Sequence, residues 1–258
     1  MSWKHTQVIA VVSVLFLSAC SKSEPEAVSE PPPDEEAAAA AESAPEPVVE
    51  KAASSDPTVA DPDRYTAEFE NDAVRIVRIR YGAGEESVMH HHPNSVAVFI
   101  TDTVGQMTTP DGSIVEFSAA AGDAVFNPAG DHLPRNTSDA AWEVVEVELK
   151  QRESVQAGAS APHASVVDPE HYAVEFENEA VCIVRIKYGA GEESVMHHHP
   201  DSVAVFLTDH LVEMKMPDGS TEEISAKAGD AMFIPGGDHL PRNIFDSAWE
   251  LVLIELKQ

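Results

Sequence analysis

The chain contains an internal repeat of 90 residues, which occurs twice. Residues 61–150 align with residues 168–257 at a constant offset of 107, without a gap, and 62 of the 90 aligned positions are identical. Two such copies in a chain of 258 residues predict two domains of the same fold. A structure or a site that one copy forms is therefore expected in the other copy as well.

Each copy has the sequence pattern of β-strands. Residues 74–81 and 95–101 are rich in β-branched and aromatic residues and are bounded by Gly, Pro and Asn. Residues 142–149 alternate in part, and the run Pro-Asp-Gly-Ser at 110–113 predicts a turn between two further short strands. No window of ten or more residues has helical spacing. Several short strands in so short a segment predict a small antiparallel sandwich or barrel.

The segments outside the copies differ from them in composition. Residues 21–60 are almost entirely Glu, Asp, Pro, Ala, Ser and Val without an aromatic residue, which predicts disorder. Residues 151–167 form a linker rich in Gly, Ala and Ser. The predicted organisation is a signal peptide (1–19), a disordered acidic linker (20–60), a first barrel (61–150), a second linker (151–167) and a second barrel (168–258).

The first residues have the pattern of an export signal. Lys4 and His5 precede an apolar run at 8–17, which is half the length that a helix needs to span a bilayer. The run ends in Leu-Ser-Ala-Cys, which resembles the processing box of bacterial lipoproteins. That resemblance implies that Cys20 becomes the lipidated N-terminus and anchors the chain at the periplasmic side of the cell envelope. Ser21 resembles the pattern of outer-membrane sorting; the alternative is a simple secretory signal with an unrelated cysteine.

The charge of the chain excludes one class of partner. The formal net charge is −29, from 45 acidic and 16 basic side chains, so we expect no nucleic-acid partner. Part of this charge lies in the linker, since residues 24–63 hold twelve carboxylates and one lysine. The two cysteines, Cys20 and Cys182, do not define a disulfide framework.

A run of three histidines is the strongest chemical signal in each copy. His90 and His92 share one face of a predicted strand, whereas His91 points the other way. A third imidazole from a facing strand would complete a site for one ion, and His132 is the candidate. Three imidazoles suit zinc, iron, copper or nickel and leave positions for water or substrate. The second copy offers the equivalent set His197, His199 and His239.

These histidines belong to two spaced motifs. Gly84-x5-His90-x-His92 and Gly122-x5-Pro128-x-Gly130-x-His132-x3-Asn136 closely resemble the two cupin motifs, and the resemblance covers about seven-tenths of the chain. It implies an all-β fold of two tandem jelly-roll β-barrels, each with one divalent transition metal (Fe, Zn, Cu, Ni or Mn) held inside by its three histidines. Single cupins commonly form dimers, so the resemblance also implies that the two repeats pair with each other.

The motifs depart from the family pattern in two ways. The family's first motif usually supplies a glutamate as fourth ligand, but Val96 and Ala97 occupy those positions, as do Val203 and Ala204 in the second copy. This favours a three-histidine site and argues against close kinship with oxalate- or germin-type enzymes. The second motif also has one residue fewer than usual between Gly130 and His132.

Other notable residues have simpler interpretations. His91 and His198 are expected to point outward, Glu85 and Glu86 to be solvated turn residues, and Arg135 to point away from the metal. Trp142 and Trp249 are expected in a core or an interface. Cys182 aligns with Arg75, so a role that both sites share cannot depend on it.

Two functions remain open from the sequence, together with a purely structural scaffold. The first is a metal-dependent enzyme on a small molecule, because three-histidine cupins resemble dioxygenases of diketones or thiols; Asn136 would then orient the substrate. No catalytic acid or base is identifiable on the predicted metal face. The second is a non-catalytic lipoprotein that binds a metal or a small ligand for sensing, storage or delivery. Metal analysis and oxygen consumption would distinguish them.

Overall fold

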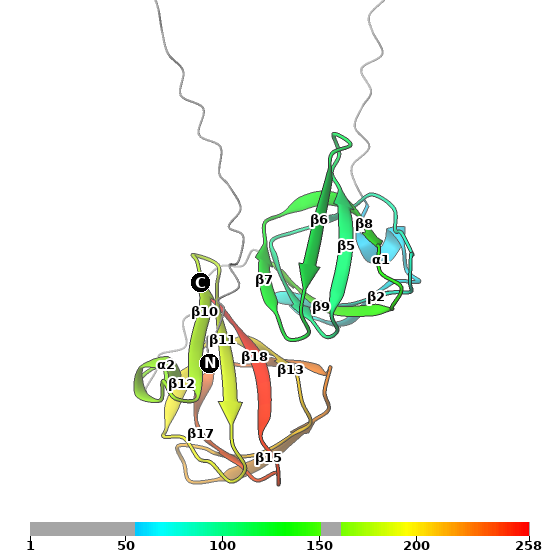
Figure 1. Ribbon diagram of the computed structural model, residues 1–258. Coiled ribbons are helices and arrows are strands. Elements are labelled where there is room, and N and C mark those ends of the chain that lie inside the picture. The colour runs from blue at the N-terminus through cyan, green and yellow to red at the C-terminus, as the bar shows by residue number, and fades with distance from the viewer. Residues whose placement is uncertain (1–54, 151–160, 258) are drawn as a thin grey trace, which may run out of the picture. The chain divides into compact units, whose positions relative to one another are not determined.

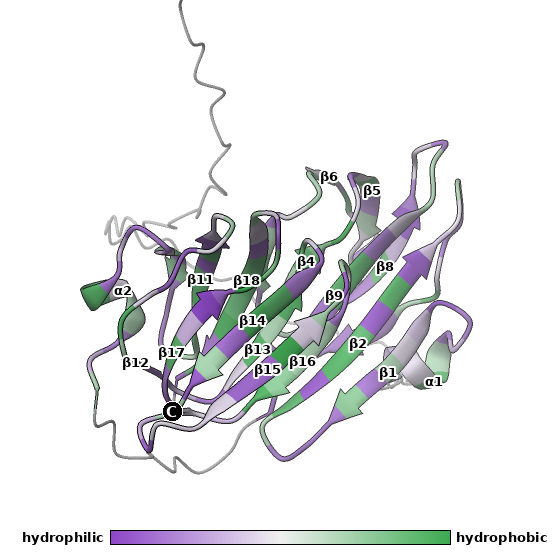
Figure 2. Cartoon of the chain, turned by 90° about the horizontal axis from the view of Figure 1, so that it is seen from below, coloured by the Kyte–Doolittle hydropathy of each residue, from purple (hydrophilic) through white to green (hydrophobic). Residues whose placement is uncertain are grey.

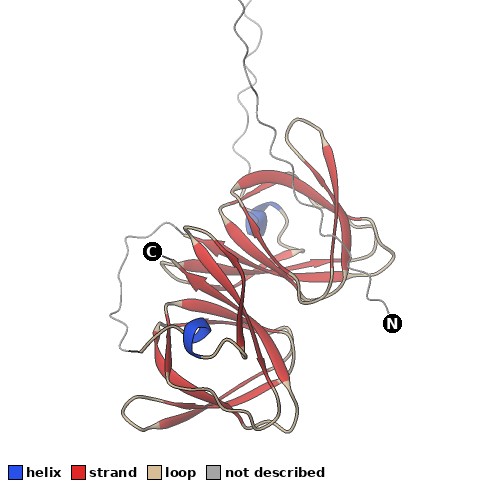
Figure 3. Ribbon diagram, turned by 60° about the vertical axis from the view of Figure 1, so that its left-hand side comes forward, coloured by secondary structure: helices blue, strands red, loops and turns tan. Residues whose placement is uncertain are grey.

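The computed structural model describes residues 55–150 and 161–257, and within them each repeat consists of nine strands and one four-residue helix (Figures 1 and 3). The first repeat comprises α1 (Pro57–Ala60), β1 (Tyr65–Glu70), β2 (Val74–Tyr81), β3 (His90–His92), β4 (Ser95–Phe99), β5 (Thr103–Thr108), β6 (Ile114–Ala119), β7 (Ala124–Asn127), β8 (Gly130–Asn136) and β9 (Trp142–Leu149). The second comprises α2 (Ala164–Val167), β10 (Tyr172–Glu177), β11 (Val181–Tyr188), β12 (His197–His199), β13 (Ser202–Phe206), β14 (His210–Lys215), β15 (Thr221–Ala226), β16 (Ala231–Ile234), β17 (Gly237–Asn243) and β18 (Trp249–Leu256).

The strands of each repeat form two antiparallel sheets. In the first repeat the orders are β1-β2-β9-β4-β7 and β3-β8-β5-β6, and the second repeat has the same orders with its own strands, β10-β11-β18-β13-β16 and β12-β17-β14-β15. Several neighbouring strands are far apart in sequence, since β9 lies between β2 and β4, and this arrangement is typical of a jelly roll. The predicted all-β fold of two tandem barrels is confirmed.

The sequence located the central strands better than the edge strands. β2 and β9 have the bounds predicted at 74–81 and 142–149, whereas β4 ends at Phe99. β1 was not predicted, because five of its six residues are exposed and the strand carries little apolar pattern. In Figure 2 hydrophobic and hydrophilic residues follow one another in bands along β2.

The structure differs from the sequence interpretation just before each repeat. Residues 55–60 were expected to be disordered, but they include α1, whose first turn is capped because the Asp56 carboxylate accepts a hydrogen bond of 2.9 Å from the Thr58 N–H. Likewise α2 lies in the stretch that was interpreted as linker. Ser55 and His163 form parallel bridges with His90 and His198, so each lead-in segment lies against a histidine strand.

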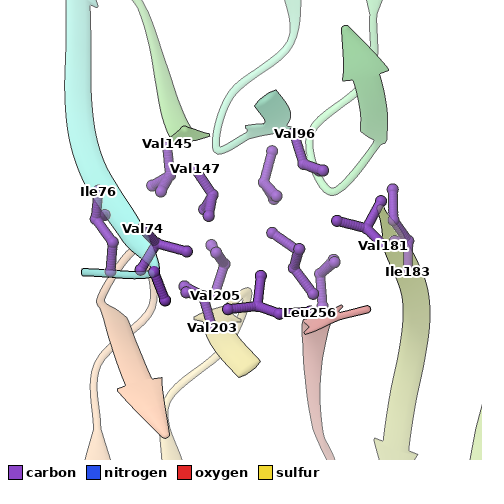
Figure 4. Close-up of a cluster of buried hydrophobic side chains, with 14 residues drawn as sticks. Val74, Ile76, Val96, Val145, Val147, Val181, Ile183, Val203, Val205 and Leu256 are labelled. Carbon is purple, nitrogen blue, oxygen red and sulfur yellow. The ribbon is translucent and has the colours of Figure 1, made fainter. Parts of the chain in front are cut away.

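The two faces of the five-stranded sheet have different neighbours. On β9, Trp142 and Val144 pack inside the barrel among aromatic residues of the same repeat. Val145 and Val147 face outward, and they belong to a cluster of buried aliphatic side chains that takes members from both repeats (Figure 4). From the first repeat this cluster contains Ala73, Val74, Ile76, Val96, Val98, Val145 and Val147, and from the second Val181, Ile183, Val203, Val205, Val252, Ile254 and Leu256.

The membrane-related predictions concern residues outside this description. The signal peptide, Cys20 and most of the acidic linker lie outside the described residues. In the two described stretches, no helix is both long and apolar enough to cross a bilayer.

Candidate metal sites

The structure brings the three predicted histidines of each repeat together. β3 pairs with β8 so that His90 lies directly opposite His132, and the alternation of the strand puts His92 on the same face. His90 and His92 are buried, and the ligand nitrogens of the three side chains lie within 4.8 Å of one another. The single shortened spacing in the second motif therefore does not displace His132.

The second barrel repeats this geometry. His197 lies opposite His239 in the pairing of β12 with β17, and His199 completes the group. Centroids of the imidazole rings are separated by 4.9, 4.9 and 5.3 Å, compared with 5.0, 4.8 and 5.2 Å in the first barrel.

The hydrogen bonds of the imidazoles leave one nitrogen free for an ion. His90 Nδ1 donates to the carbonyl of Val88 at 2.8 Å, and its Nε2 is buried without a hydrogen-bond partner. His197 has the same arrangement with Val195 and the same unpartnered Nε2. A buried nitrogen lone pair without a partner is unfavourable in an ordinary core, and a metal ion would satisfy it. The donor set therefore fits a divalent transition metal.

The environment also keeps two imidazoles of each triad neutral, those of His90 and His132 and those of His197 and His239. Burial, followed by the charge of His92, lowers the pKa of His90 to about 4. Burial, followed by His92 and His90, lowers the pKa of His132 to about 3. The equivalent pKa values in the second barrel fall to about 4 at His197 and about 3 at His239 for the same reasons. Neutral imidazole is the form that binds a metal.

A carboxylate behind the site orients the second histidine of each triad. His92 Nδ1 donates to Glu148 at 2.8 Å, and His199 Nδ1 donates to Glu255 at 2.6 Å. Burial alone would raise the pKa of Glu148, but hydrogen bonds from His92 and Arg75 bring that pKa below its ordinary value. Such a carboxylate fixes the tautomer and orientation of a metal-binding imidazole.

The first barrel holds a second carboxyl group, which has no counterpart in the other barrel. Glu146 of β9 is buried on the same strand face as Glu148, and it accepts a hydrogen bond from Ser95 Oγ. Burial raises the pKa of Glu146, and hydrogen bonds from Ser95 and Asn127 oppose the rise. In the second copy Leu253 replaces this glutamate and Ile234 replaces Asn127.

These substitutions leave the second barrel with an apolar cavity. It has a volume of about 50 Å³ and is lined by His199 and His239 together with Ile234 and Leu253. His210 Nδ1 and Ser202 Oγ also line it, and both atoms are buried without a hydrogen-bond partner. A void of 150 Å³ holds a benzene molecule, so this one would take only a few heavy atoms.

The structure also shows where the other residues discussed in the sequence analysis lie. His91 is exposed and His198 lies beside Asp238, so neither joins a triad. Arg135 is exposed, and Trp142 is buried and stacked on Tyr81. The idea that Asn136 orients a substrate is wrong, because its amide donates to the carbonyls of Gly82 and Ala140 and accepts from Ser138.

Three residues near the first triad were not predicted from the sequence: Tyr65, Glu146 and Glu148. Tyr65 packs its ring edge-on against His90 with centroids 4.7 Å apart, and its hydroxyl bonds to that of Tyr81. Glu146 and Glu148 could have been found, because they share the strand parity of the buried Trp142. Tyr65 carried no such signal, because it begins an otherwise exposed edge strand.

Comparisons with known proteins agree with this architecture. No family model matches the chain, and no curated protein matches it. Among solved structures, AerE from Microcystis aeruginosa is 14% identical with a TM-score of 0.52, covering 76% of this chain and 98% of that chain. Oxalate decarboxylase from Bacillus subtilis is 13% identical with a TM-score of 0.52, covering 72% of this chain and 68% of that chain. A cupin 2 conserved barrel domain protein from Leptotrichia buccalis is 12% identical with a TM-score of 0.48, covering 75% of this chain and 88% of that chain.

At these identities the similarity concerns the fold and not the activity. Together with the strand topology and the paired motifs, the similarity to AerE and to oxalate decarboxylase defines the class of fold: each repeat is a cupin-type jelly-roll barrel. The chain is a tandem pair of such barrels, a bicupin, with one histidine triad in each.

Proposed function

We propose that each barrel binds one divalent transition-metal ion through its three histidines, and that the first barrel is a metal-dependent enzyme that acts on a small molecule. The observation that carries the metal assignment is the convergence of three imidazoles in each barrel, with Nε2 of His90 and of His197 buried and unpartnered. When bound, the ion would supply a Lewis acid that polarises an oxygen atom of substrate or water.

The catalytic part of the proposal depends on Glu146. A carboxyl group whose pKa is raised by burial is a stronger base than an ordinary carboxylate, so it is suited to proton exchange with a substrate. Its neighbours are Ser95, which donates to it, and His92 of the triad. We assign to Glu146 the removal of a proton from a small carbon acid or thiol as the substrate becomes an anionic ligand.

The reaction class that we favour is oxygen-dependent, in line with the resemblance to three-histidine dioxygenases. The solved structure of oxalate decarboxylase makes oxalate a second substrate to test. We expect oxalate to be a poor substrate, because Val96 and Val203 stand where a fourth, glutamate ligand is usual.

The second barrel supports a different function, the non-catalytic binding of a metal and a small ligand. Leu253 and Ile234 remove the carboxyl group and the amide that accompany the first triad, and they line an apolar cavity. One chain would then combine a reactive site with a binding site.

We also propose that the chain is a lipoprotein of the cell envelope, tethered through Cys20 on the periplasmic side and sorted to the outer membrane. The sequence of residues 4–21 supports this proposal. A Cys20→Ser variant should lose incorporation of labelled fatty acid and leave the membrane fraction. Fatty-acid labelling that persists in this variant would contradict the tether.

Metal content and turnover together test the enzyme proposal. We expect two metal ions per chain when only the triads are loaded, and one in each of the variants His132→Ala and His239→Ala. Oxygen consumption with a panel of diketones and thiols should disappear in His132→Ala and fall about 100-fold or more in Glu146→Gln, which keeps its metal. Turnover that survives in His132→Ala would contradict catalysis in the first barrel, and metal content unchanged by both histidine variants would contradict the metal sites.

A further inference from the structure

The second barrel buries a histidine that the first barrel lacks. At the offset of 107, Thr103 of the first repeat becomes His210 of the second. Thr103 is buried, and its hydroxyl donates to the carbonyl of Thr101 at 3.1 Å. His210 is also buried, with 5% of its surface exposed, but its Nδ1 has no hydrogen-bond partner within the described part of the chain. A buried nitrogen in this state indicates a partner that comes from outside the chain.

His210 lies toward the end of the barrel interior that is remote from the triad. Its ring contacts those of Trp249 and Phe206, with centroid separations of 4.2 and 4.9 Å. Trp249 and Glu255 share one face of β18, and they are about 20 Å apart along the strand. Because Glu255 bonds to His199 of the triad, it marks the metal end of the interior. His210 is therefore not a ligand of the triad's ion.

The apolar cavity of the second barrel connects these two ends. Its lining includes His210 at one end and His199 of the triad at the other. Between them it is lined by Leu251 and Leu253, successive inward-facing residues of β18, and by Ile224 of β15. Because a volume of only about 50 Å³ is spread along this row, the cavity is a narrow channel. Such a channel admits an unbranched chain but not a ring, which needs a wider void.

The lining of the channel favours an uncharged ligand. Among the residues that the structure describes, no lysine, arginine, aspartate or glutamate lines it. Burial lowers the pKa of His210 to about 4, so its imidazole is neutral at pH 7. An ionised group beside His210 would lose its hydration without gaining an opposite charge, which is strongly unfavourable. A hydroxyl group avoids this cost, and it can donate to Nδ1 or accept from it in either tautomer of His210.

We propose that the second barrel binds a short, unbranched primary alcohol, with its hydroxyl group hydrogen-bonded to His210 Nδ1 and its alkyl chain beside Leu251 and Leu253. This inference rests on the ligand-binding function proposed above for the second barrel, and it names the class of ligand. The volume of the channel limits the chain to about four carbons. The first barrel should not bind the alcohol, because the Thr103 hydroxyl already has its partner and Glu146 stands in place of Leu253.

Methyl NMR of the methionine residues tests this proposal within one molecule. Met214 lines the channel, and its counterpart Met107 in the first repeat provides an internal control. The full chain is isotope-labelled at its methionine methyl groups, kept metal-free and titrated with butan-1-ol; Met214→Leu and Met107→Leu assign the two signals. We expect a saturable shift of the Met214 signal, with a dissociation constant of about 1 mM, and no shift of the Met107 signal.

Further probes and matched variants locate the bound alcohol. The branched isomer 2-methylpropan-2-ol and the anion butanoate should leave the Met214 signal in place at concentrations where butan-1-ol saturates it. His210→Leu replaces a buried, unpartnered nitrogen by an apolar group of similar volume, so it should not disturb folding and should weaken binding about tenfold. Thr103→Val is the matched change in the first repeat, and it should leave the affinity for butan-1-ol unchanged.

The outcomes are separable from those of the proposed function, because the titration uses metal-free protein. A Met214 signal that butan-1-ol does not shift, or that shifts in parallel with Met107, would overturn the inference. Equal affinities in His210→Leu and Thr103→Val would overturn the hydrogen bond to His210. A chain that binds two metal ions but no alcohol would overturn this inference and leave the triads intact, whereas a chain that binds the alcohol but no metal would overturn the triad sites alone.

Discussion

His92 and Glu148 are joined by a hydrogen bond of 2.8 Å, and their counterparts His199 and Glu255 by one of 2.6 Å. Of the three imidazoles in each triad, this one is therefore held by a charged acceptor, whereas His90 and His197 are held by backbone carbonyls. Removing this carboxylate should lower the affinity of the triad for its metal ion, although the carboxylate is not itself a ligand of the ion.

The variant Glu148→Gln tests this response. An amide stabilises the metal-binding tautomer of His92 less well, so we expect the affinity of the first barrel for its ion to fall 10- to 100-fold. Competition with a chelator measures the affinity, in a His239→Ala background that silences the second triad. Glu116→Gln, on the exposed β6, is the matched control and should leave the affinity unchanged. Equal affinities for the two variants would contradict the orienting role.

The buried carboxyl group of the first barrel should reduce stability. Replacing Glu146 and Asn127 by Leu and Ile, as the second barrel has them, should raise the free energy of unfolding by about 1–2 kcal/mol and abolish turnover. Because the pKa of Glu146 is raised in the folded state, its charged form disfavours folding above the unfolded value near 4.5. The stabilisation should therefore grow as the pH rises from 4 toward 7.

Urea unfolding of the metal-free protein at several pH values measures this difference. The reverse substitution Leu253→Glu is the matched change in the other copy, and it should be destabilising at neutral pH. A double variant that is less stable than the parent at pH 7 would show that Glu146 is a favourable part of the core.

The triads should make the metal-free protein acid-sensitive. The pKa of His90 is lowered from 6.5 to about 4, so the unfolded chain binds a proton below pH 6.5 that the folded chain does not. Stability is therefore lost as the pH falls from 6.5 toward 4, by up to about 3 kcal/mol for this one residue. His90→Gln should flatten that slope, and saturating metal at neutral pH should stabilise the fold. Equal slopes in the parent and the variant would contradict the burial of a neutral His90.

The aliphatic cluster with members from both repeats should make them interdependent. An isolated second repeat would expose Val203, Val205 and Ile254, which are fully buried in the full chain, so we expect it to self-associate. Val205→Asp should abolish this association and cost the full chain about 3 kcal/mol or more. Val104→Asp, at a position 49% exposed, is the control. Sedimentation that finds a stable monomer of the unaltered repeat would contradict this prediction.

The architecture and the histidine triads could be predicted because both depend on patterns between residues that are close in the sequence. The histidine spacing and the strand parity of His90 and His92 place them on one face, and the motif resemblance supplied His132. The strand parity of Trp142 places Glu146 on the buried face, but its contact with Ser95 could not be predicted, because it joins positions 51 apart in the chain and no local pattern reveals which strands become neighbours. Asp56 and His163 were missed because their segments lacked periodicity, whereas the structure ties these segments to the histidine strands through backbone bridges.

These bridges determine where a fragment of the protein can begin. The carbonyl of Ser55 accepts a hydrogen bond from the His91 N–H, and Asp56 anchors Arg75, so a fragment that starts at residue 61 would lose both contacts. A fragment of the second repeat that starts at residue 168 would likewise lack Pro162, which bonds His198, and His163. Expression fragments that begin at least six residues further upstream would keep the histidine strands supported along both edges.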